Sequence, residues 1–264
     1  MADVARAGLG EFLRSRRERL SPVALGLPDR RRRRTPGLRR EEVAELAGIG
    51  VDWYIRLEQG RTVSPSTETI EALAGALRLD DAERAHLREL ARNPARTAFA
   101  RESVPDATRG LVENLTQPAY VTGRRWDVLA WNRAAVSLFI DFGKVPEADR
   151  NVLVFLFLDE RARRLFGPGW AAQAEYVVAQ FHAAHDLWAP DPAFTGLADR
   201  LRAGCPEFAG WWERHDVVHS GPGRKTLYRP EPAEFEYATF QANEDPALRL
   251  TLYAPVRRPR TSGR

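Results

Sequence analysis

The sequence predicts an α+β protein of two domains: an all-helical N-terminal domain of five helices, and a C-terminal α/β domain built on an antiparallel sheet. Three observations support this fold class. Apolar residues recur at three- and four-residue steps in residues 1–93, as in amphipathic helices. Proline and polar residues interrupt that pattern in residues 94–107, which we expect to be a linker. In residues 108–264, alternating apolar residues between glycine- or proline-marked turns predict strands.

The first helix is expected at Gly8–Arg19, where the apolar side chains share one face. A loop from Ser21 to Gly37 follows and contains the run Arg30–Arg34. Most charge runs are solvated segments. In proteins that bind DNA, however, a flexible arginine arm follows phosphates or enters a narrow minor groove. Both interpretations stay open, and the pair of helices that the next residues, 35–61, predict makes contact with DNA the one we favour.

Residues 35–61, TPGLRREEVAELAGIGVDWYIRLEQGR, predict two short helices joined by a turn at Gly48 and Gly50. Gly60 stands where a helix C-cap belongs. A helix pair with such a turn is the unit that lays its second helix in the major groove of DNA. The apolar residues of the first helix, expected to face inward, are Leu38, Val43, Leu46 and Ala47. The apolar residues that recur at helical spacing in the second helix are Val51, Tyr54 and Leu57.

Capping patterns predict two more helices in this domain. Ser64-Pro65 marks the start of the fourth, because a capping side chain precedes proline at the first helical position. Asp80 and Glu83 form the capping-box pattern that opens the fifth. Asn93-Pro94 ends that helix and closes the domain.

The second half mixes strands and helices. Residues 111–131 predict a helix end and two strands about a Thr122-Gly123 turn, and Asn132 is placed to cap the next helix. The longer helices that apolar spacing predicts are Arg150–Leu158, Ala171–Leu187 and Thr195–Ala203. The further strands expected are Asp216–Ser220, Arg224–Tyr228, Phe235–Gln241 and Leu248–Ala254. A helical insert inside a strand-built domain is the expected arrangement.

Composition limits the kind of protein that this chain can be. No apolar run is long enough to cross a bilayer, and the N-terminus lacks the apolar segment of a secretory signal, so we expect a cytoplasmic protein. Cys205 is the single cysteine, which excludes an intramolecular disulfide. Residues 1–61 hold 14 arginines against 9 acidic residues, an excess of +5, whereas the whole chain carries +4. The excess charge therefore lies with the expected DNA-binding helices, where it favours phosphates.

Two resemblances follow from these motifs. Leu57-Glu58-Gln59-Gly60 ends the second helix of the pair in a way that resembles the phage-repressor-like (XRE) helix-turn-helix family, over roughly the first 92 residues. This resemblance implies a buried ion pair between Arg17 and Glu58, which orients the helices and does not contact DNA.

Three further segments, PAYVTGRRWDVLAWNRAA at 118–135, RNVLVFLF at 150–157 and PEFAGWWERHDV at 206–217, resemble the MmyB-like transcription regulators. That family joins an XRE DNA-binding domain to a C-terminal PAS-like ligand-binding domain. With the helix pair included, the resemblance covers nearly the whole chain. It implies a bacterial transcription regulator that binds a hydrophobic, fatty-acid-like small molecule and needs no cofactor.

The outward positions of the second helix of the pair are expected to contact operator DNA. Arg56 suits guanine, Asp52 can accept a hydrogen bond from cytosine, and Val51 can touch a thymine methyl group. Arg40, near the start of the preceding helix, is expected at a phosphate.

Two more residues complete the expected DNA contacts. Trp53 is expected against the sugar-phosphate backbone, with packing on the domain as the alternative, and Arg61 is of a type that contacts base edges or phosphates. Such domains bind inverted repeats as symmetric dimers, so we expect a homodimer on double-stranded DNA.

Aromatic residues are abundant in the second half, and most of them must belong to an ordinary core. Small-molecule pockets are lined mainly by such apolar side chains together with a few polar groups. We therefore expect a subset of these aromatic residues to line a pocket. Arg150 and Asn151, directly before VLVFLF, are candidate anchors for a carboxylate head. The candidate ligand-binding residues are Tyr120, Trp131, Arg150, Asn151, Phe155 and His215.

No catalytic pattern stands out, and we expect no enzyme. His182, His185, His215 and His219 have neither an H-E-x-x-H sequence nor a cysteine partner, so we expect no metal site. Cys205 has no local signature of a nucleophile and is expected to be a small buried apolar residue.

The expected function is a ligand-responsive transcription regulator, with repression relieved by ligand as the first hypothesis. One alternative is a C-terminal domain that serves only dimerisation or protein contacts, as in antitoxins; a fully packed core would favour it. The other is an enzyme fused to a DNA-binding domain, which would require a convergent polar cluster in the second half.

Overall fold

The computed structural model describes residues 2–27, 37–61, 65–92, 98–188, 191–218, 221–243 and 245–256. The run Arg30–Arg34 and Ser64 lie outside these residues. The chain forms two compact units, each assembled from three stretches. The first is Met1–Ala98, Ala179–Ala198 and Gly210–His219; the second is Phe99–Val178, Asp199–Ala209 and Ser220–Arg264.

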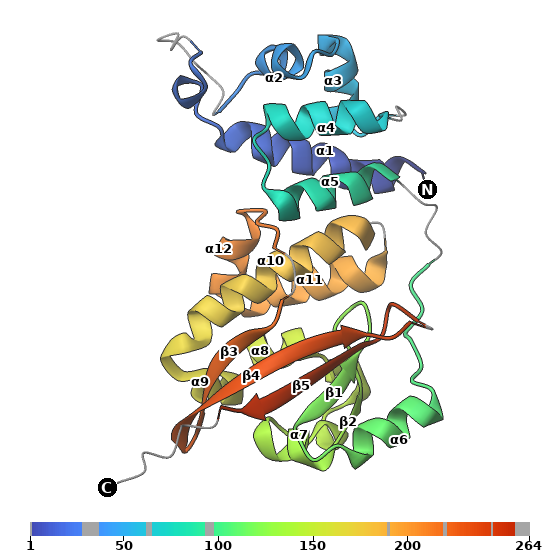
Figure 1. The fold of residues 1–264 in the computed structure, drawn as a ribbon, viewed down its shortest axis with the longest axis vertical. Coiled ribbons are helices and arrows are strands. Elements are labelled where there is room, and N and C mark those ends of the chain that lie inside the picture. The colour runs from blue at the N-terminus through green and yellow to red at the C-terminus, as the bar shows by residue number, and fades with distance from the viewer. Residues whose placement is uncertain are drawn as a thin grey trace, which may run out of the picture. The chain divides into compact units, whose positions relative to one another are not determined.

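Within the described residues up to 92, five α-helices form, as predicted (Figure 1). They are α1 (Ala2–Arg19), α2 (Arg40–Ala47), α3 (Val51–Glu58), α4 (Thr67–Ala76) and α5 (Asp81–Arg92), with the 3-10 helix η1 (Val23–Leu25) after α1. Helix α1 begins before the predicted Gly8, because the alanine-containing segment ahead of the apolar stripe has high helix propensity.

These helices enclose one apolar core. Leu13 of α1, Tyr54 of α3, Leu73 of α4 and Leu87 of α5 are fully buried in it. Burying a side chain of this kind stabilises a fold by about 1.5–3 kcal/mol relative to leaving it exposed.

Leu46 of α2 was predicted to face inward, and this prediction is wrong: the residue is 44% exposed. Val43 and Ala47, which lie one helical turn apart, occupy the buried side of α2. Leu46 points away from that side.

Local capping explains where α4 and α5 begin. Ser66, two residues after the predicted Ser64, caps α4 by accepting a hydrogen bond from the Thr69 amide at 3.3 Å. The predicted capping box is confirmed: Asp80 accepts from the Glu83 amide at 2.8 Å, and Glu83 accepts from the Asp80 amide at 3.1 Å.

The second unit contains a five-stranded antiparallel sheet in the order β2-β1-β5-β4-β3 (Figure 1). Its strands are β1 (Ala119–Thr122), β2 (Val128–Trp131), β3 (Gly223–Arg229), β4 (Glu231–Gln241) and β5 (Arg249–Pro255). The first hairpin thus joins the C-terminal strands through β1 and β5, where Tyr120 pairs with Thr251.

A helical insert separates β2 from β3, as the sequence predicted. It consists of α7 (Arg133–Leu138), η2 (Phe142–Lys144), η3 (Glu147–Asp149), α8 (Val152–Leu158), α9 (Glu160–Phe166), η4 (Gly167–Gly169), α10 (Trp170–Trp188), α11 (Pro192–Gly204) and α12 (Pro206–Trp212). The predicted strand Asp216–Ser220 is wrong for residues 216–218, which form no strand. Val217 is instead buried in the core of the N-terminal helices.

The two faces of the sheet have different partners. Helix α6 (Asp106–Asn114) packs through Val112 against Val121 and Ala130 on one face. The opposite face carries Tyr120 and Tyr253, whose rings meet Phe139 at the end of α7. The end of α7 therefore packs on the aromatic face of the sheet.

Candidate functional site

The turn between α2 and α3 depends on glycine. Gly48 caps α2 in the left-handed conformation, with φ 65°, and its amide donates to the carbonyl of Ala44. A side chain at this φ is strained, so glycine is favoured. Gly50 then precedes α3 in an extended conformation without a side-chain cap.

Helix α3 divides its residues between two faces. Tyr54, Leu57 and Glu58 are buried. Val51 is 40% exposed, and Asp52 and Arg56 are also exposed. The structure thus brings the three predicted base-facing residues together on the open side of α3.

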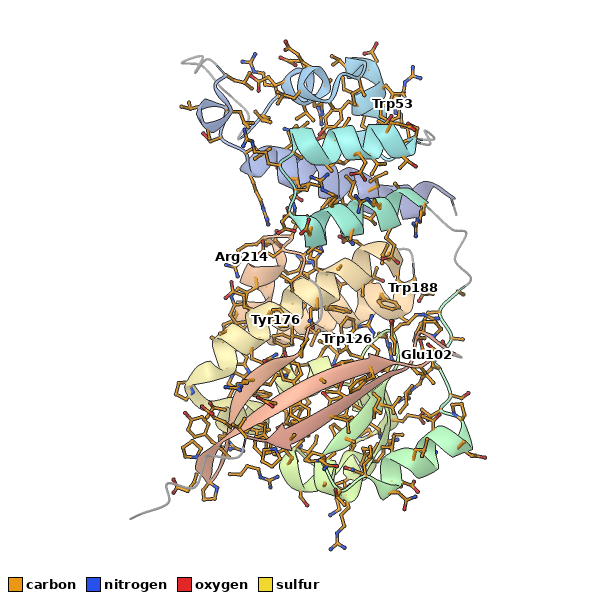
Figure 2. The ribbon with its side chains drawn as sticks, viewed as in Figure 1. Trp53, Glu102, Trp126, Tyr176, Trp188 and Arg214 are labelled. Carbon is orange, nitrogen blue, oxygen red and sulfur yellow. The ribbon has the colours of Figure 1, made fainter. Side chains whose placement is uncertain are left out.

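The other predicted DNA contacts in and just after α3 differ in their burial. Arg61, just after α3, is exposed. Trp53 is partly buried and packs against the core of the N-terminal helices, leaving part of its surface open (Figure 2).

Glu58 is held by two arginines. Arg17 Nη2 donates to Glu58 Oε1 at 2.7 Å, and Arg40 Nε donates to Oε2 at 3.1 Å. Burial alone would raise the pKa of Glu58, but these hydrogen bonds lower it below its ordinary value. The pair of Arg17 with Glu58 is therefore present as the family resemblance implied. Arg40, predicted at a phosphate, keeps 42% of its side chain exposed while sharing this carboxylate.

Two adjoining cavities lie in the second unit between the aromatic face of the sheet and the helical insert. The outer cavity has a volume of about 560 Å³ and is lined by residues such as Tyr176 of α10 and Tyr237 of β4 (Tyr176 is labelled in Figure 2). The inner cavity is narrower, about 40 Å³, and its walls are mostly buried aromatic and aliphatic side chains. Phe166, Gln173 and Lys225 line both cavities and mark their junction.

Lys225 of β3 is the cation at this junction. Its Nζ donates to the Tyr253 hydroxyl at 3.3 Å and lies 3.9 Å from the ring centre of Tyr237. Desolvation lowers the pKa of Lys225 to about 7. Near neutral pH, the charged and neutral forms of the amine are therefore both present.

The predicted ligand-binding residues fall into two groups. Tyr120 and Phe155 line the inner cavity. Trp131, Arg150, Asn151 and His215 line neither of these two cavities.

The polar pair Arg150 and Asn151 is committed to the backbone instead. Arg150 donates to the carbonyls of Phe142 at 2.9 Å and Val145 at 3.2 Å, and its guanidinium lies over the Trp131 ring. Asn151 caps α8 by accepting from the Leu153 amide at 2.8 Å. Their position before an apolar helix reflects local structure, so we do not retain them as carboxylate anchors.

His215 lies in the other unit, against the ring of His182 at 4.6 Å between ring centres. Burial lowers its pKa. Nearby, the buried carboxylate of Asp186 lies 3.1 Å from His86 Nε2 and 3.1 Å from His182 Nδ1. No group of three or more histidine, cysteine or acidic residues in the described part of the chain has an arrangement that could hold a metal ion.

Sequence reasoning missed Lys225, Phe166 and Gln173, which form the junction. One signal was present: lysine occurs only at positions 144 and 225, and Lys225 shares the inward register of β3 with Leu227. A cation on the buried side of an alternating strand is unusual enough to mark a site.

The comparisons with known proteins agree with this arrangement. Residues 104–263 match the MmyB-like transcription regulator ligand binding domain, and residues 8–87 match a helix-turn-helix domain. No curated protein matches the chain. None of the helices, within the described residues, has the length and apolar character needed to span a membrane. A DNA-binding domain and a ligand-binding domain together make this a ligand-regulated transcription regulator, and the chain belongs to the MmyB-like transcription regulators.

Proposed function

We propose that this protein is a sequence-specific repressor whose affinity for operator DNA is controlled by a hydrophobic, fatty-acid-like molecule in the outer and inner cavities. The observation that carries the proposal is a single cationic side chain, Lys225, at the junction of a wide cavity and an aromatic one. A molecule with a carboxylate head and an apolar tail needs a cationic group beside an apolar cavity.

The ligand's carboxylate is placed beside Lys225 Nζ and its chain against the aromatic walls. The outer cavity, at about 560 Å³, falls in the roughly 300–1,000 Å³ range of small-molecule pockets. Tyr120 and Phe155 supply the apolar surface of the inner cavity. Each methylene group removed from water there contributes about 0.8 kcal/mol.

The proposed DNA contacts are those that α3 leaves exposed. Val51, Asp52 and Arg56 face bases, while Arg40 and Arg61 reach phosphates and Trp53 covers the sugar-phosphate backbone. We propose a homodimer on an inverted repeat, since such domains pair with two-fold symmetric sites.

The chain's parts are assigned as residues 1–93 for DNA binding, 94–107 as linker and 108–264 for ligand binding. A protein that binds operator DNA in a bacterium works in the cytoplasm.

Ligand changes operator affinity only if it binds the DNA-competent and incompetent arrangements differently. Typical coupling free energies of about 1–3 kcal/mol correspond to roughly 5- to 150-fold changes in affinity.

The test begins with the full-length protein. Native mass spectrometry and solvent extraction identify any co-purified ligand, and selection from random DNA yields an operator. Fluorescence anisotropy then measures operator affinity with and without decanoate. We expect decanoate to weaken binding within the roughly 5- to 150-fold range above.

Gln173→Trp tests whether the response to decanoate depends on the cavities, because the larger side chain fills their junction and leaves α3 unchanged. The variant should bind operator normally and lose the response to decanoate. If neither decanoate nor any extracted apolar molecule binds the protein while it still dimerises and binds DNA, the C-terminal domain serves only assembly. If decanoate tightens operator binding, release from repression is wrong.

A further inference from the structure

The amine of Lys225 has an unusual set of neighbours. Its Nζ lies 3.9 Å from the ring centre of Tyr237, 5.5 Å from that of Tyr253 and 6.0 Å from that of Phe166. Its hydrogen-bond partner is the Tyr253 hydroxyl, at 3.3 Å. The surroundings are thus three aromatic rings and one phenol.

No acidic side chain among the described residues pairs with this amine. The preceding residue shows the contrast: Arg224, which is exposed and also lines the outer cavity, forms an ion pair with Glu236 at 2.7 Å. A cation that is half-buried among aromatic rings without an anion tends to lose its proton. Lys225 therefore offers a neutral amine, with a free lone pair, at a pH where an exposed lysine is an ammonium ion.

We propose that Lys225 captures an apolar aldehyde or ketone as a reversible imine. The inference deepens the proposed function, because it assigns a second ligand class to the same two cavities. The charged form of Lys225 suits a carboxylate, and the neutral form is the nucleophile for a carbonyl group.

The chemistry balances without any oxidant or reductant. The Nζ lone pair attacks the carbonyl carbon, and a proton moves from nitrogen to oxygen to give a carbinolamine. Its hydroxyl group is protonated and leaves as water while the C=N bond forms, and the iminium nitrogen then gives up its proton. Amine and carbonyl are thus converted to imine and water, and the reverse reaction releases the ligand.

Tyr253 is placed to assist these proton transfers. Burial raises the pKa of its phenol well above the ordinary value, so the hydroxyl stays protonated and can donate to the carbonyl oxygen or to the departing hydroxyl. The aromatic walls of the inner cavity also exclude water, which slows hydrolysis of the imine.

The outer cavity supplies the route to the amine. Lys225 lines that cavity together with the exposed Arg224 and Thr226, so a ligand from solvent meets the amine before the aromatic interior. The inner cavity is narrow at about 40 Å³, so the alkyl chain enters only as its aromatic walls rearrange. A straight-chain aldehyde fits these conditions better than a bulky carbonyl compound.

The chain contains its own control. Lys144 is the only other lysine in the sequence, and its side chain is 85% exposed. Full-length protein is incubated at pH 7 with decanal and sodium cyanoborohydride, which reduces an imine to a stable secondary amine. Peptide mapping by mass spectrometry then measures decyl modification at Lys225, Lys144 and the N-terminal amine.

We expect Lys225 to be modified more than about tenfold faster than Lys144 at pH 7, since only about 0.04% of an ordinary lysine is neutral there. The ratio should fall toward one as the pH approaches 10. Lys225→Arg should abolish the preferred modification, and Lys144→Arg should leave it unchanged. Tyr253→Phe should slow imine formation more than it weakens decanoate binding.

Equal modification of the two lysines at pH 7, or no modification at Lys225, overturns the proposal that Lys225 forms an imine. Because this comparison uses the unmodified protein, it decides the question even if Lys225→Arg fails to fold. Decanoate binding is measured in parallel. If decanoate binds and lowers operator affinity while decanal does not modify Lys225, the imine proposal is wrong and the proposed function stands. If neither decanoate nor decanal binds, the imine proposal and the proposed function are both wrong.

Discussion

Arg17 and Glu58 form a two-point ion pair in which Arg17 Nη2 donates to Oε1 at 2.7 Å and Nε donates to Oε2 at 3.2 Å. The side chains are 3% and 1% exposed. Arg17 also donates to the Leu38 carbonyl at 2.8 Å, which ties α1 to α3 and to the chain entering α2. A buried pair of this kind orients its elements more than it adds to net stability.

Arg17→Ala should lower the free energy of unfolding by up to about 3–5 kcal/mol, because it leaves the buried carboxylate of Glu58 with Arg40 as its remaining partner. Urea unfolding followed by tryptophan fluorescence measures the change. Arg14→Ala is the control: Arg14 is 62% exposed and pairs with Glu18 on the helix surface, so it should cost less than about 1 kcal/mol. Equal effects of the two substitutions would show that the buried pair is not what holds α1 and α3 together.

Glu58 should also make folding sensitive to acid. Its folded-state pKa is lowered, so its contribution to stability is complete above the unfolded-state value of about 4.3 and is lost as pH falls through the folded value. Melting temperature measured between pH 6 and pH 3 should therefore fall less steeply for Glu58→Gln than for the native protein. Parallel curves would contradict this assignment.

Arg56→Ala and Arg40→Ala should separate sequence discrimination from general attraction to DNA. Arg56 is exposed on α3, so its loss should relax the preference at one base pair in each half-site by about 1–3 kcal/mol. Arg40→Ala should weaken binding to all sequences and flatten the salt dependence. Affinities for the operator and its single-base variants, at several salt concentrations, test both. An unchanged sequence preference in Arg56→Ala would remove that residue from the base contacts.

Decanoate binding should depend on pH through Lys225. The pKa of this amine is about 7 without ligand, so affinity should be highest below pH 7. Above that pH it should fall by up to about tenfold per unit as the amine loses its proton. Isothermal titration calorimetry from pH 6 to pH 9 measures this slope. Lys225→Met should remove the slope and Lys144→Met should keep it; a slope that survives in Lys225→Met assigns the proton to another group.

Gly167 should be intolerant of a side chain. It adopts φ 51°, and a Cβ there would lie 2.6 Å from the ring of Tyr228, which lines the outer cavity. Gly167→Ala should cost about 1–3 kcal/mol in backbone strain and displace that ring, weakening decanoate binding. Gly110→Ala is the control, because a Cβ at Gly110 meets nothing within 4 Å and this glycine lines neither cavity. Identical decanoate affinities in the two variants would mean that Tyr228 does not shape the bound state.

Local patterns allowed the N-terminal helices to be predicted from sequence, because amphipathic spacing and capping act within a few residues. Asp80 and Glu83 form their capping box as expected. Lys225 could not be placed in this way. Its environment depends on the pairing of β3 with β4 and on helices more than 35 residues away in the chain, such as α10 with Tyr176.

Arg150 and Asn151 show how a local interaction can resemble a binding site. Polar residues before an apolar run suit a ligand anchor, but they equally suit a helix cap, and here the backbone of α8 takes the Asn151 side chain. Sequence alone does not say which partner is closer. The fold decides it, by bringing the Phe142 carbonyl within 2.9 Å of Arg150.

The division of α3 into a buried and an exposed face has an evolutionary consequence. Tyr54, Leu57 and Glu58 hold the helix in place, whereas Val51, Asp52 and Arg56 contribute little to the core. Under the proposed DNA contacts, substitutions at the exposed positions therefore redirect the regulator to new promoters at little cost in folding. Gene duplicates of such a protein could diverge in their target genes while keeping the same response to a shared ligand.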